Sequence, residues 1–335
     1  MATATLKAGS TAGNGLRPID FSRDLGQVAD LIELCFSHEL ARHGRGAVSE
    51  MRMMARLGPL MGALHRAMQW QGSSMWSDGF VWVEDGKLVG NISLQRSDTR
   101  PDVWLVANVA VHPDYRRRGM ARQLTAAGLD FARQHGGRRA QLQVDGTNYG
   151  AHDLYYGLGF VLDSNRTTWE RARASTVPNA MTVEGVEFRP LRDGEWRAAY
   201  HLLEQVLPEG LEWTRPLRER DFRPSLWLSI DNALQGHKEE NWAAFDQQSG
   251  ALLGFVRMVT MYGSLTRFSI VIDPRWRATL FEPLLVRALR RLGRVPWSVR
   301  LDYPTFEQTE TLERYGFRPT RTLLWMSHEL RSDRV

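Results

Sequence analysis

The two halves of the chain present the same sequence features in the same order. The first half opens with Leu16–Ile19, which reads L-R-P-I, and the second opens with Phe188–Leu191, which reads F-R-P-L. A helical pattern follows each opening, and hairpin patterns with turns at Asp85-Gly86 and Ser249-Gly250 come next. The period of roughly 160 to 170 residues is too long for a solenoid, so the repeat predicts two tandem domains of one fold.

The length of 335 residues fits two domains of ordinary size. We expect a disordered tail at residues 1–14, a first domain at 15–172, a linker at 173–183 and a second domain at 184–332. The linker is placed where Ser175–Asn179 interrupts both periodicities. The sequence shows no signal peptide, anchor or membrane-spanning run, so we expect a soluble protein of the cytoplasm.

Charge and composition argue against a nucleic-acid partner, an intrachain disulfide and a metal site. Nucleic acid is not expected, because 43 basic and 38 acidic residues leave a net charge of only +5. The single cysteine, Cys35, excludes an intrachain disulfide, and it lies on the apolar stripe of a helix that Ser22 is expected to cap. We therefore predict a buried side chain rather than a reactive thiol. His38, His43 and His65 lack the spacing of metal ligands, so no metal site is expected.

A predicted strand, loop and helix in the first half form a candidate anion site. Trp104–Val111 is rich in β-branched and aromatic residues, which predicts a buried strand, and His112-Pro113 ends it. From Ala121 the small and apolar residues recur at spacings of three and four, which predicts a helix that Gly136-Gly137 ends. Gly119 lets the backbone between them approach a ligand closely. Because a helix N-terminus has unpaired donors and partial positive charge, the sequence predicts a pyrophosphate site here.

The loop matches neither of two widespread phosphate-binding patterns, the Walker loop and the dinucleotide fingerprint. It reads R-x-x-G-x-A at Arg116, Gly119 and Ala121, and V-A-V-H-P-D-Y precedes it. This string resembles the acyl-coenzyme A loop of the GNAT superfamily of N-acetyltransferases. A second string, beyond a strand pattern at Gln141–Val144, also resembles that family. Its matched residues are Asn148, Ala151, Leu154, Tyr155, Leu158, Gly159 and Phe160.

The resemblance implies an α/β (α+β) fold class with two tandem GNAT folds. Each is expected to be a mixed, mostly antiparallel sheet, flanked by helices and splayed at its fourth and fifth strands. The implied activity is that of an acyl-coenzyme A-dependent N-acyltransferase, which moves an acetyl group from acetyl-coenzyme A (acetyl-CoA) to a primary amine by direct transfer. Acetyl-CoA is then the cosubstrate and the partner is a small-molecule or peptide amine, while a homodimer stays open.

The resemblance also assigns roles to single residues. Tyr155 stands where the family keeps its general acid, and a phenol is protonated at neutral pH. Asn148 stands where the family binds the pantetheine arm, although a turn or helix-cap role is an alternative. The other cofactor-binding residues are expected to act through the main chain. Val109, Ala110 and Val111 run beside the pantetheine arm, and Arg116, Arg117, Arg118, Gly119, Met120, Ala121 and Arg122 hold the pyrophosphate.

The general base is the point at which the sequence departs from the family pattern. Many relatives have a glutamate directly before Asn108, whereas this chain has Ala107. His112 and Asp145 are near enough in sequence to be candidates. A water ordered by Asn108 or by backbone carbonyls could also take the proton, and a substrate that arrives neutral would need no base.

Two other groups of residues are candidates for substrate contacts. Arg138 and Arg139 could reach the nucleotide 3′-phosphate. Five methionines fall on a predicted helical pair that is split at Gly58-Pro59 and corresponds to the family's variable lid over the acceptor: Met51, Met53, Met54, Met61 and Met68. Core packing is the alternative role of these methionines.

The second copy of the repeat lacks the residues that carry chemistry. Aligned with the first copy, it has Leu280 in the place of the loop glycine, Glu282 in the place of the alanine and Leu312 in the place of the tyrosine. A carboxylate close to a phosphate would repel it. We therefore expect a degenerate GNAT-like domain that buttresses the fold, mediates dimerisation or forms one wall of the acceptor cleft.

Two other functions stay open at this point. One is a non-catalytic acyl-CoA-binding regulatory module, which the missing glutamate and the decayed second copy favour. The other is a tandem acyltransferase similar to mycothiol synthase, in which the C-terminal half is the active one. The glycine retained in the first copy, and lost from the second, argues against that arrangement here.

Overall fold

The computed structural model describes residues 14–37, 40, 46–57, 78–172, 178–207, 219, 222–223, 237–261, 266–292 and 298–330. The predicted tail lies outside the described residues, apart from Asn14. So do several other features of the sequence: His38, His43, His65, the Gly58-Pro59 break, Met61, Met68 and residues 173–177 of the predicted linker.

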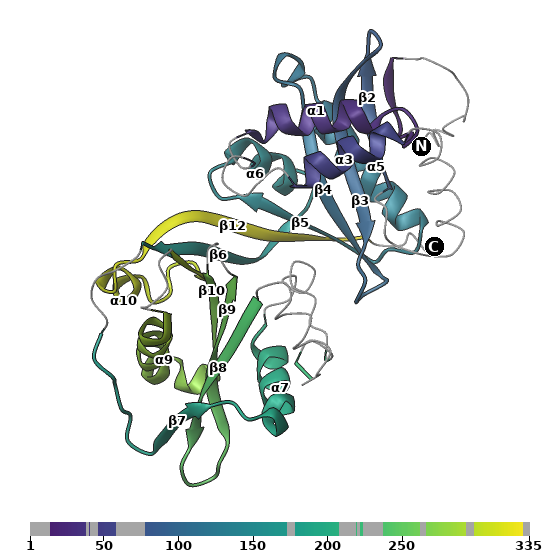
Figure 1. Ribbon diagram of the computed structural model, residues 1–335. Coiled ribbons are helices and arrows are strands. Elements are labelled where there is room, and N and C mark those ends of the chain that lie inside the picture. The colour runs from purple at the N-terminus through teal and green to yellow at the C-terminus, as the bar shows by residue number, and fades with distance from the viewer. Residues whose placement is uncertain are drawn as a thin grey trace. The chain divides into compact units, whose positions relative to one another are not determined.

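The chain forms two compact units, each with helices packed on a mixed, mostly antiparallel sheet (Figure 1). The first unit comprises Met1–Gln143, Tyr149–Val161 and Met326–Val335, and the second comprises Val144–Asn148 and Leu162–Trp325. The predicted fold class is confirmed. The predicted repeat is visible in the order of the strands, because in each unit four consecutive strands pair antiparallel and the next strand pairs parallel to the fourth.

The first unit contains strands in the order β1-β2-β3-β4-β5, continued by the end of β12. Its elements are β1 (Gly15–Pro18), α1 (Leu25–Cys35), α3 (Gly46–Arg56), β2 (Asp78–Glu84), β3 (Lys87–Arg96), β4 (Val103–Val111), η1 (Pro113–Tyr115), α5 (Met120–Gln134), β5 (Arg139–Asp145) and α6 (Tyr149–Tyr156). The turn between β2 and β3 is the predicted one, since Asp85 and Gly86 both have positive φ (49° and 74°), as a two-residue hairpin turn requires.

The two faces of this sheet are covered by different helices. Helix α5 lies close against β3 because Gly128 has no side chain: a Cβ there would be 2.9 Å from Ile92 Cδ1. Phe80 of β2 also faces α5, since its ring meets Phe131 edge to face at 5.9 Å. Neighbouring residues of a strand point to opposite faces. Val81 accordingly packs with Val28 and other residues of α1, so α1 covers the face opposite α5.

The second unit contains strands in the order β12-β6-β11-β10-β9-β8-β7. Its elements are β6 (Val161–Arg171), β7 (Val186–Pro190), η2 (Asp193–Glu195), α7 (Trp196–Val206), β8 (His237–Asp246), β9 (Leu252–Met261), β10 (Thr266–Ile272), η5 (Pro274–Trp276), α9 (Arg277–Leu292), β11 (Val299–Pro304), α10 (Thr309–Arg314) and β12 (Arg318–Glu329). Its largest core cluster is built around α9, whose Leu280, Phe281, Leu284 and Leu285 are fully buried.

The last strand of each half contributes residues to the other half's compact unit. Strand β6 is the last strand of the first half, but from Leu162 onward it belongs to the second unit, and it pairs antiparallel with β11 from Arg166↔Pro304 to Arg171↔Val299. The end of β12, from Met326 onward, belongs to the first unit, where Leu330 N donates to Arg138 O at 2.8 Å. The compact units therefore differ from the sequence ranges 15–172 and 184–332 at these two strands and at Val144–Asn148, which belongs to the second unit.

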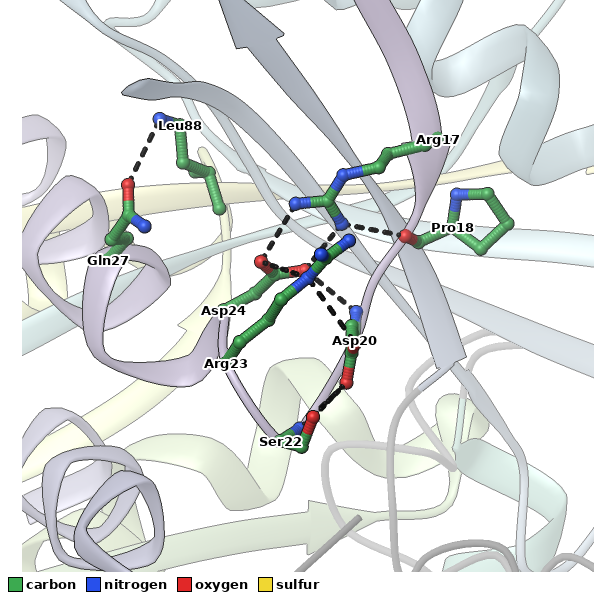
Figure 2. Close-up of polar contacts among 8 residues, drawn as sticks. All are labelled: Arg17, Pro18, Asp20, Ser22, Arg23, Asp24, Gln27 and Leu88. Carbon is green, nitrogen blue, oxygen red and sulfur yellow. Dashed lines mark hydrogen bonds and ion pairs between the residues drawn. The ribbon is translucent and has the colours of Figure 1, made fainter. Parts of the chain in front are cut away.

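The two openings of the repeat form the same ion pair. Arg17 holds both carboxylate oxygens of Asp24, at 2.5 and 2.8 Å, as Figure 2 shows. In the second unit Arg189 holds both oxygens of Glu195, at 2.8 and 2.7 Å. In each case an arginine of the opening strand fixes the start of the following helix. The hydrogen bond with Arg189 is the main cause that lowers the pKa of Glu195 to about 2.

The predicted cap of α1 is wrong. Helix α1 begins at Leu25 with Asp24 at the N-cap, and the Ser22 hydroxyl instead donates to Asp20 at 2.5 Å (Figure 2). The Asp24 carboxylate accepts from the backbone N–H of Asp20 at 2.7 Å, so both of its oxygens are occupied. Tertiary contacts with β1, which a local pattern does not reveal, set the start of this helix.

Removing the Asp24 carboxylate is expected to destabilise the first unit strongly. The side chain of Asp24 is only 2% exposed and that of Arg17 is 24% exposed, so Asp24→Ala leaves a largely buried arginine without its counter-charge. We expect the free energy of unfolding to fall by about 3 kcal/mol. Asp20→Ala is the matched control: that side chain is 42% exposed, and the expected loss is below about 1 kcal/mol. Urea titrations at pH 7 measure both, and equal losses would contradict this view of the ion pair.

No helix among the described residues is long and apolar enough to cross a membrane. Within the same residues, no group of three or more His, Cys, Asp or Glu side chains is placed to hold a metal ion.

Candidate functional site

Strand β4 bulges and then separates from β5. Asn91 of β3 faces Ala110, and Ser93 faces Ala107, so Ile92 alone opposes both Asn108 and Val109. Asn108 has a left-handed backbone (φ 52°), as bulged residues often do. The parallel pairing with β5 ends at Val106↔Leu142, although β4 continues to Val111. The predicted splay at the fourth and fifth strands is confirmed. The main chain of the predicted pantetheine-binding residues Val109, Ala110 and Val111 is therefore not paired with β5.

The predicted anion loop lies between β4 and α5 and has unsatisfied backbone donors. Arg117 and Gly119 have positive φ (66° and 79°), and Gly119 is the N-cap of α5. Alternation of left-handed and right-handed residues makes successive N–H groups converge, which is an anion-binding geometry. Among the described residues, the N–H groups of Arg117, Arg118 and Gly119 find no acceptor. Those of the first turn, Met120 to Arg122, have no intrahelical partner either.

Gly119 has a left-handed backbone conformation, which favours glycine, and the space in front of it is open. The nearest atom to a Cβ built there is Gln123 Nε2, at 3.9 Å. A side chain would therefore meet no protein atom closely, but it would adopt a strained φ and extend into the space before the loop donors. The loop and the helix start thus form an open cradle of N–H groups, in the place that the sequence predicts.

The side chains of the arginines serve mainly to hold this loop in place. Arg116 Nε donates to Val111 O at 3.0 Å, and Arg118 Nη2 donates to Asp114 O at 3.3 Å. Arg118 also lies 5.0 Å from the centre of the Tyr115 ring, and its guanidinium is 3.8 Å from Glu84. The Arg117 side chain is exposed and has no partner among the described residues. Of these three arginines, Arg117 is therefore the one whose guanidinium is free for an anion.

Arg122 connects the loop helix to the helix that carries the predicted general acid. Its Nη1 donates to Gly157 O, directly after α6, at 3.0 Å. Gly157 is necessary for this contact, because a Cβ there would be 2.6 Å from Arg122 Nη2. Arg122 was predicted to hold pyrophosphate through its main chain, and its side chain has this additional positioning role, which the sequence pattern did not show.

Tyr155 is buried in α6, whereas its neighbour Tyr156 is half exposed. The Tyr155 ring meets Phe160 at 5.6 Å, and its hydroxyl makes no hydrogen bond with the described residues. Burial raises the pKa of Tyr155 to about 12, so the phenol stays protonated throughout the neutral range. The phenol therefore holds the proton that the predicted general acid needs, and the catalytic role of Tyr155 stays a prediction.

Asp145 is the last residue of β5, and Asn148 lies in the turn between β5 and α6. Asn148 N donates to Asp145 O at 2.9 Å, and the Asp145 carboxylate accepts from Thr147 N at 3.0 Å. Arg321 of β12 approaches the other carboxylate oxygen at 2.9 Å. These bonds outweigh burial and lower the pKa of Asp145, which makes it a weak base. Asp145 therefore orders the turn that presents Asn148, and the structure does not support it as the general base.

The other base candidate, His112, caps the short helix η1. Its Nδ1 accepts from Asp114 N at 3.3 Å, and the Asp114 carboxylate is 3.7 Å away.

Arg138 and Arg139 lie at the opposite end of β4 from the loop, because their backbone N–H groups donate to Asp102 O, directly before β4 begins. The whole length of β4, at about 3.3 Å per residue, separates Arg138 and Arg139 from the loop. Their position therefore does not support contacts with a nucleotide phosphate at the loop.

Cys35 is half buried rather than fully buried, and it touches the site. It packs beside the apolar cluster of α1, and its Sγ lies 3.4 Å from Val111 O and 3.9 Å from Arg116 Nη2. Burial is the main cause that raises the pKa of this thiol. The prediction of an unreactive thiol therefore keeps its physical basis, although the predicted degree of burial was too high.

The second unit does not form the equivalent cradle. Helix α9 begins at Arg277, directly after η5, so the residues aligned with the loop form its first turn instead. Leu280 and Leu312, which replace the glycine and the tyrosine, are both fully buried in the core. Glu282 is held by Arg314 at 3.0 Å and by the Tyr315 hydroxyl at 2.9 Å. These positions support the prediction of a degenerate second copy.

Sequence reasoning overlooked Asn91, which lies beside the bulge of β4 and is fully buried. Its Nδ2 donates to Asn108 O at 3.0 Å. The available signal was a lone amide within the otherwise apolar run of β3, a residue type that is seldom fully buried without a specific role.

Comparisons with known proteins show which family the N-terminal half resembles. Residues 48–160 match the model of the family described as acetyltransferase (GNAT) family. Among curated proteins, the chain is 29% identical over 181 residues to a mycothiol acetyltransferase of Mycolicibacterium vanbaalenii, which covers 52% of this chain and 54% of that protein. A mycothiol acetyltransferase of Acidimicrobium ferrooxidans is 36% identical over 109 residues, 30% of this chain and 34% of that protein. The chain thus matches about half the length, or less, of these relatives.

Two solved structures show the same fold over nearly the whole chain. A tandem GNAT protein from the clavulanic acid biosynthesis pathway has a TM-score of 0.54 and 17% identity, with 95% of this chain and 99% of that chain covered. A GCN5-related N-acetyltransferase from Sphaerobacter thermophilus has a TM-score of 0.58 and 18% identity, with 96% and 98% covered. At this identity the likeness is one of fold, and it extends to both halves.

Proposed function

We propose that this chain, whose N-terminal half carries a domain of the GNAT acetyltransferase family, is an acyl-CoA-dependent N-acyltransferase with its active site in that half. The observation that carries the proposal is the cradle of free N–H groups around Gly119, at the start of α5 and beside the open end of β4. A pyrophosphate suits the cradle, and the separated end of β4 offers backbone groups to a pantetheine arm.

The chemistry assigned to the first unit is a direct transfer of an acetyl group. The amine nitrogen attacks the thioester carbonyl carbon, a C–N bond forms and the C–S bond breaks. In this proposal a backbone N–H of the bulged strand polarises the carbonyl oxygen. Tyr155 supplies a proton to the departing thiolate, and the proton lost by the amine passes to water. Acetyl-CoA is the proposed cosubstrate, and no metal is assigned a role.

The acceptor of the mycothiol acetyltransferases is a specific second candidate for the substrate. The similarity to two such proteins favours it. In mycothiol synthase the C-terminal half is the active one, whereas here the cradle lies in the N-terminal half. We therefore include this acceptor in the test below without preferring it to other primary amines.

The test is release of coenzyme A from acetyl-CoA by the full chain. Thiol is measured with a panel of primary amines that includes small molecules, peptides with free amino groups and the acceptor of the mycothiol acetyltransferases. We expect amine-dependent thiol release with at least one class. Binding of acetyl-CoA without release across the panel would instead favour a non-catalytic acyl-CoA-binding module, and absence of binding would overturn both.

We further expect the enzyme in the cytoplasm, where acetyl-CoA is the available donor. Cell fractionation with an antibody tests this location. Whether the chain forms a homodimer stays a prediction that sedimentation can decide.

A further inference from the structure

A network of three polar side chains, Asn91, Ser93 and Asn108, lies beside the bulge of β4. Asn91 Nδ2 is 3.0 Å from Asn108 O and 3.4 Å from Ser93 Oγ. Asn108 Nδ2 is 3.2 Å from the same Ser93 Oγ. The network thus connects the bulged residue of β4 to two positions of β3 that flank the change of register.

This network lies on the face of the sheet that α1 covers. Asn91 is paired with Val81 on one side and with Ala110 on the other, so all three side chains point to one face. Val81 and Ala110 belong to the apolar cluster of α1. The polar network is therefore set into an apolar layer, directly beside the strand segment that is expected to carry the thioester.

One atom of the network has no partner. Asn91 is 0% exposed, and its Oδ1 is a buried acceptor without a hydrogen bond in the described part of the chain. Buried amide oxygens nearly always have a partner, so this one requires an explanation. Ser93 Oγ lies within reach of both amide groups as an acceptor, which leaves its own hydrogen free to donate. Within the network, the buried acceptor without a partner is Asn91 Oδ1, and the Ser93 hydroxyl has a hydrogen left to donate.

The reaction proposed above needs a route for the proton of the amine. The residue before Asn108 is Ala107 rather than a carboxylate, Asp145 is held by Thr147 and Arg321, and His112 caps η1. None of these three positions offers a free base. Beside the bulge, Asn91 Oδ1 is the fully buried acceptor that has no partner in the described part of the chain.

We propose that Asn91 is a positioning residue for this reaction: its Nδ2 fixes the bulge through Asn108 O, and its Oδ1 holds the water that takes the proton of the amine. The inference rests on the proposed function. As the C–N bond forms and the C–S bond breaks, the amine proton passes to this water and on to solvent. The thiolate takes its proton from Tyr155. The amide of Asn91 neither gains nor loses a proton. Ser93 donates to the same water.

Three variants of the full chain test the inference. Asn91→Leu removes the free oxygen, Asn91→Asp keeps an oxygen there but loses the donor to Asn108, and Ser93→Ala removes only a half-buried hydroxyl. For Asn91→Leu we expect a loss in kcat of about 100-fold, with the dissociation constant of coenzyme A changed by less than about threefold. Asn91→Asp is expected to retain clearly more activity than Asn91→Leu, and Ser93→Ala to lose about tenfold in kcat.

The matched control is Ser97→Ala, which removes a buried hydroxyl directly after β3, 3.3 Å from Thr99 Oγ1 and remote from the bulge. It is expected to keep the wild-type kcat. If Asn91→Leu and Asn91→Asp lose activity equally and in step with thermal stability, the network is structural and the inference fails while the proposed function stands. The same holds if all variants turn over like the wild type.

A second readout does not depend on turnover. A crystal structure of the wild-type protein is expected to show an ordered water within hydrogen-bond distance of Asn91 Oδ1 and Ser93 Oγ. A protein atom in that place would overturn the inference even if every variant were inactive. A wild type without turnover on any amine contradicts the proposed function instead, and this water then decides the inference separately.

Discussion

Gly119→Asp is expected to raise the dissociation constant of coenzyme A by about 100-fold, which corresponds to about 2.7 kcal/mol of binding free energy. Gly119 has φ 79°, a conformation that aspartate tolerates better than most residues, so the loop is expected to keep its shape. The new carboxylate extends into the open space before the free N–H groups, where it occupies the place of a phosphate and repels it. Calorimetric titration with coenzyme A measures the effect.

The chain offers a matched control for this substitution at the other end of the same helix. Gly136 follows α5, has φ 80° and has nothing within 4 Å of a Cβ built there. Gly136→Asp therefore introduces the same charge and similar strain without approaching the cradle, and we expect unchanged affinity within about twofold. Equal losses at both positions would mean that the effect is one of stability. Retained affinity in Gly119→Asp, with coenzyme A located beside Leu280, would place the active half on the other side of the repeat.

Tyr155→Phe is expected to lower kcat by about 100-fold while the affinity for coenzyme A stays the same within about twofold. Phenylalanine preserves the edge-to-face contact with Phe160 at 5.6 Å, so the loss is confined to the hydroxyl. Because the pKa of Tyr155 is raised to about 12, a proton donor at this position stays in its active form as the pH rises through the neutral range. The wild-type kcat should therefore show no alkaline loss from this group below about pH 10.

Tyr156→Phe is the control, since Tyr156 is the next residue of the same helix and is 50% exposed. It should turn over at the wild-type rate. Steady-state kinetics with acetyl-CoA and the best amine of the panel compares the two variants. Wild-type turnover in Tyr155→Phe would rule out the hydroxyl as the proton donor, while the assignment of the cradle would stand.

The position of β12, whose end from Met326 onward belongs to the first unit, gives a reason why a degenerate second half is retained. Strand β12 supplies Arg321, which holds Asp145 at 2.9 Å in the turn that presents Asn148. The first half alone would lack both this arginine and the strand end that bonds to Arg138 O. The second copy has lost its own cradle, and its last strand nevertheless supports residues that follow β5.

Local features of the site were predictable because their causes lie within a few residues. The local sequence specifies a strand, a loop at Gly119 and a periodic helix. These elements form in any context that buries their apolar faces. The turn at Asp85-Gly86 formed as expected for the same reason. The loss of the second cradle was also readable from the sequence, since Leu280 favours burial in a continuous helix.

Other features were set only by contacts between residues far apart in the chain. Helix α1 starts at Leu25 because Arg17 of a neighbouring strand captures Asp24, and Asp145 is a poor base because Arg321 reaches it from the last strand. The sequence by itself determined a tandem repeat with one candidate anion loop, since backbone conformation and periodicity are local properties. Tertiary structure alone decided which strand completes which unit and that Asn91 buries a free acceptor beside the bulge, because pairing and burial depend on distant partners.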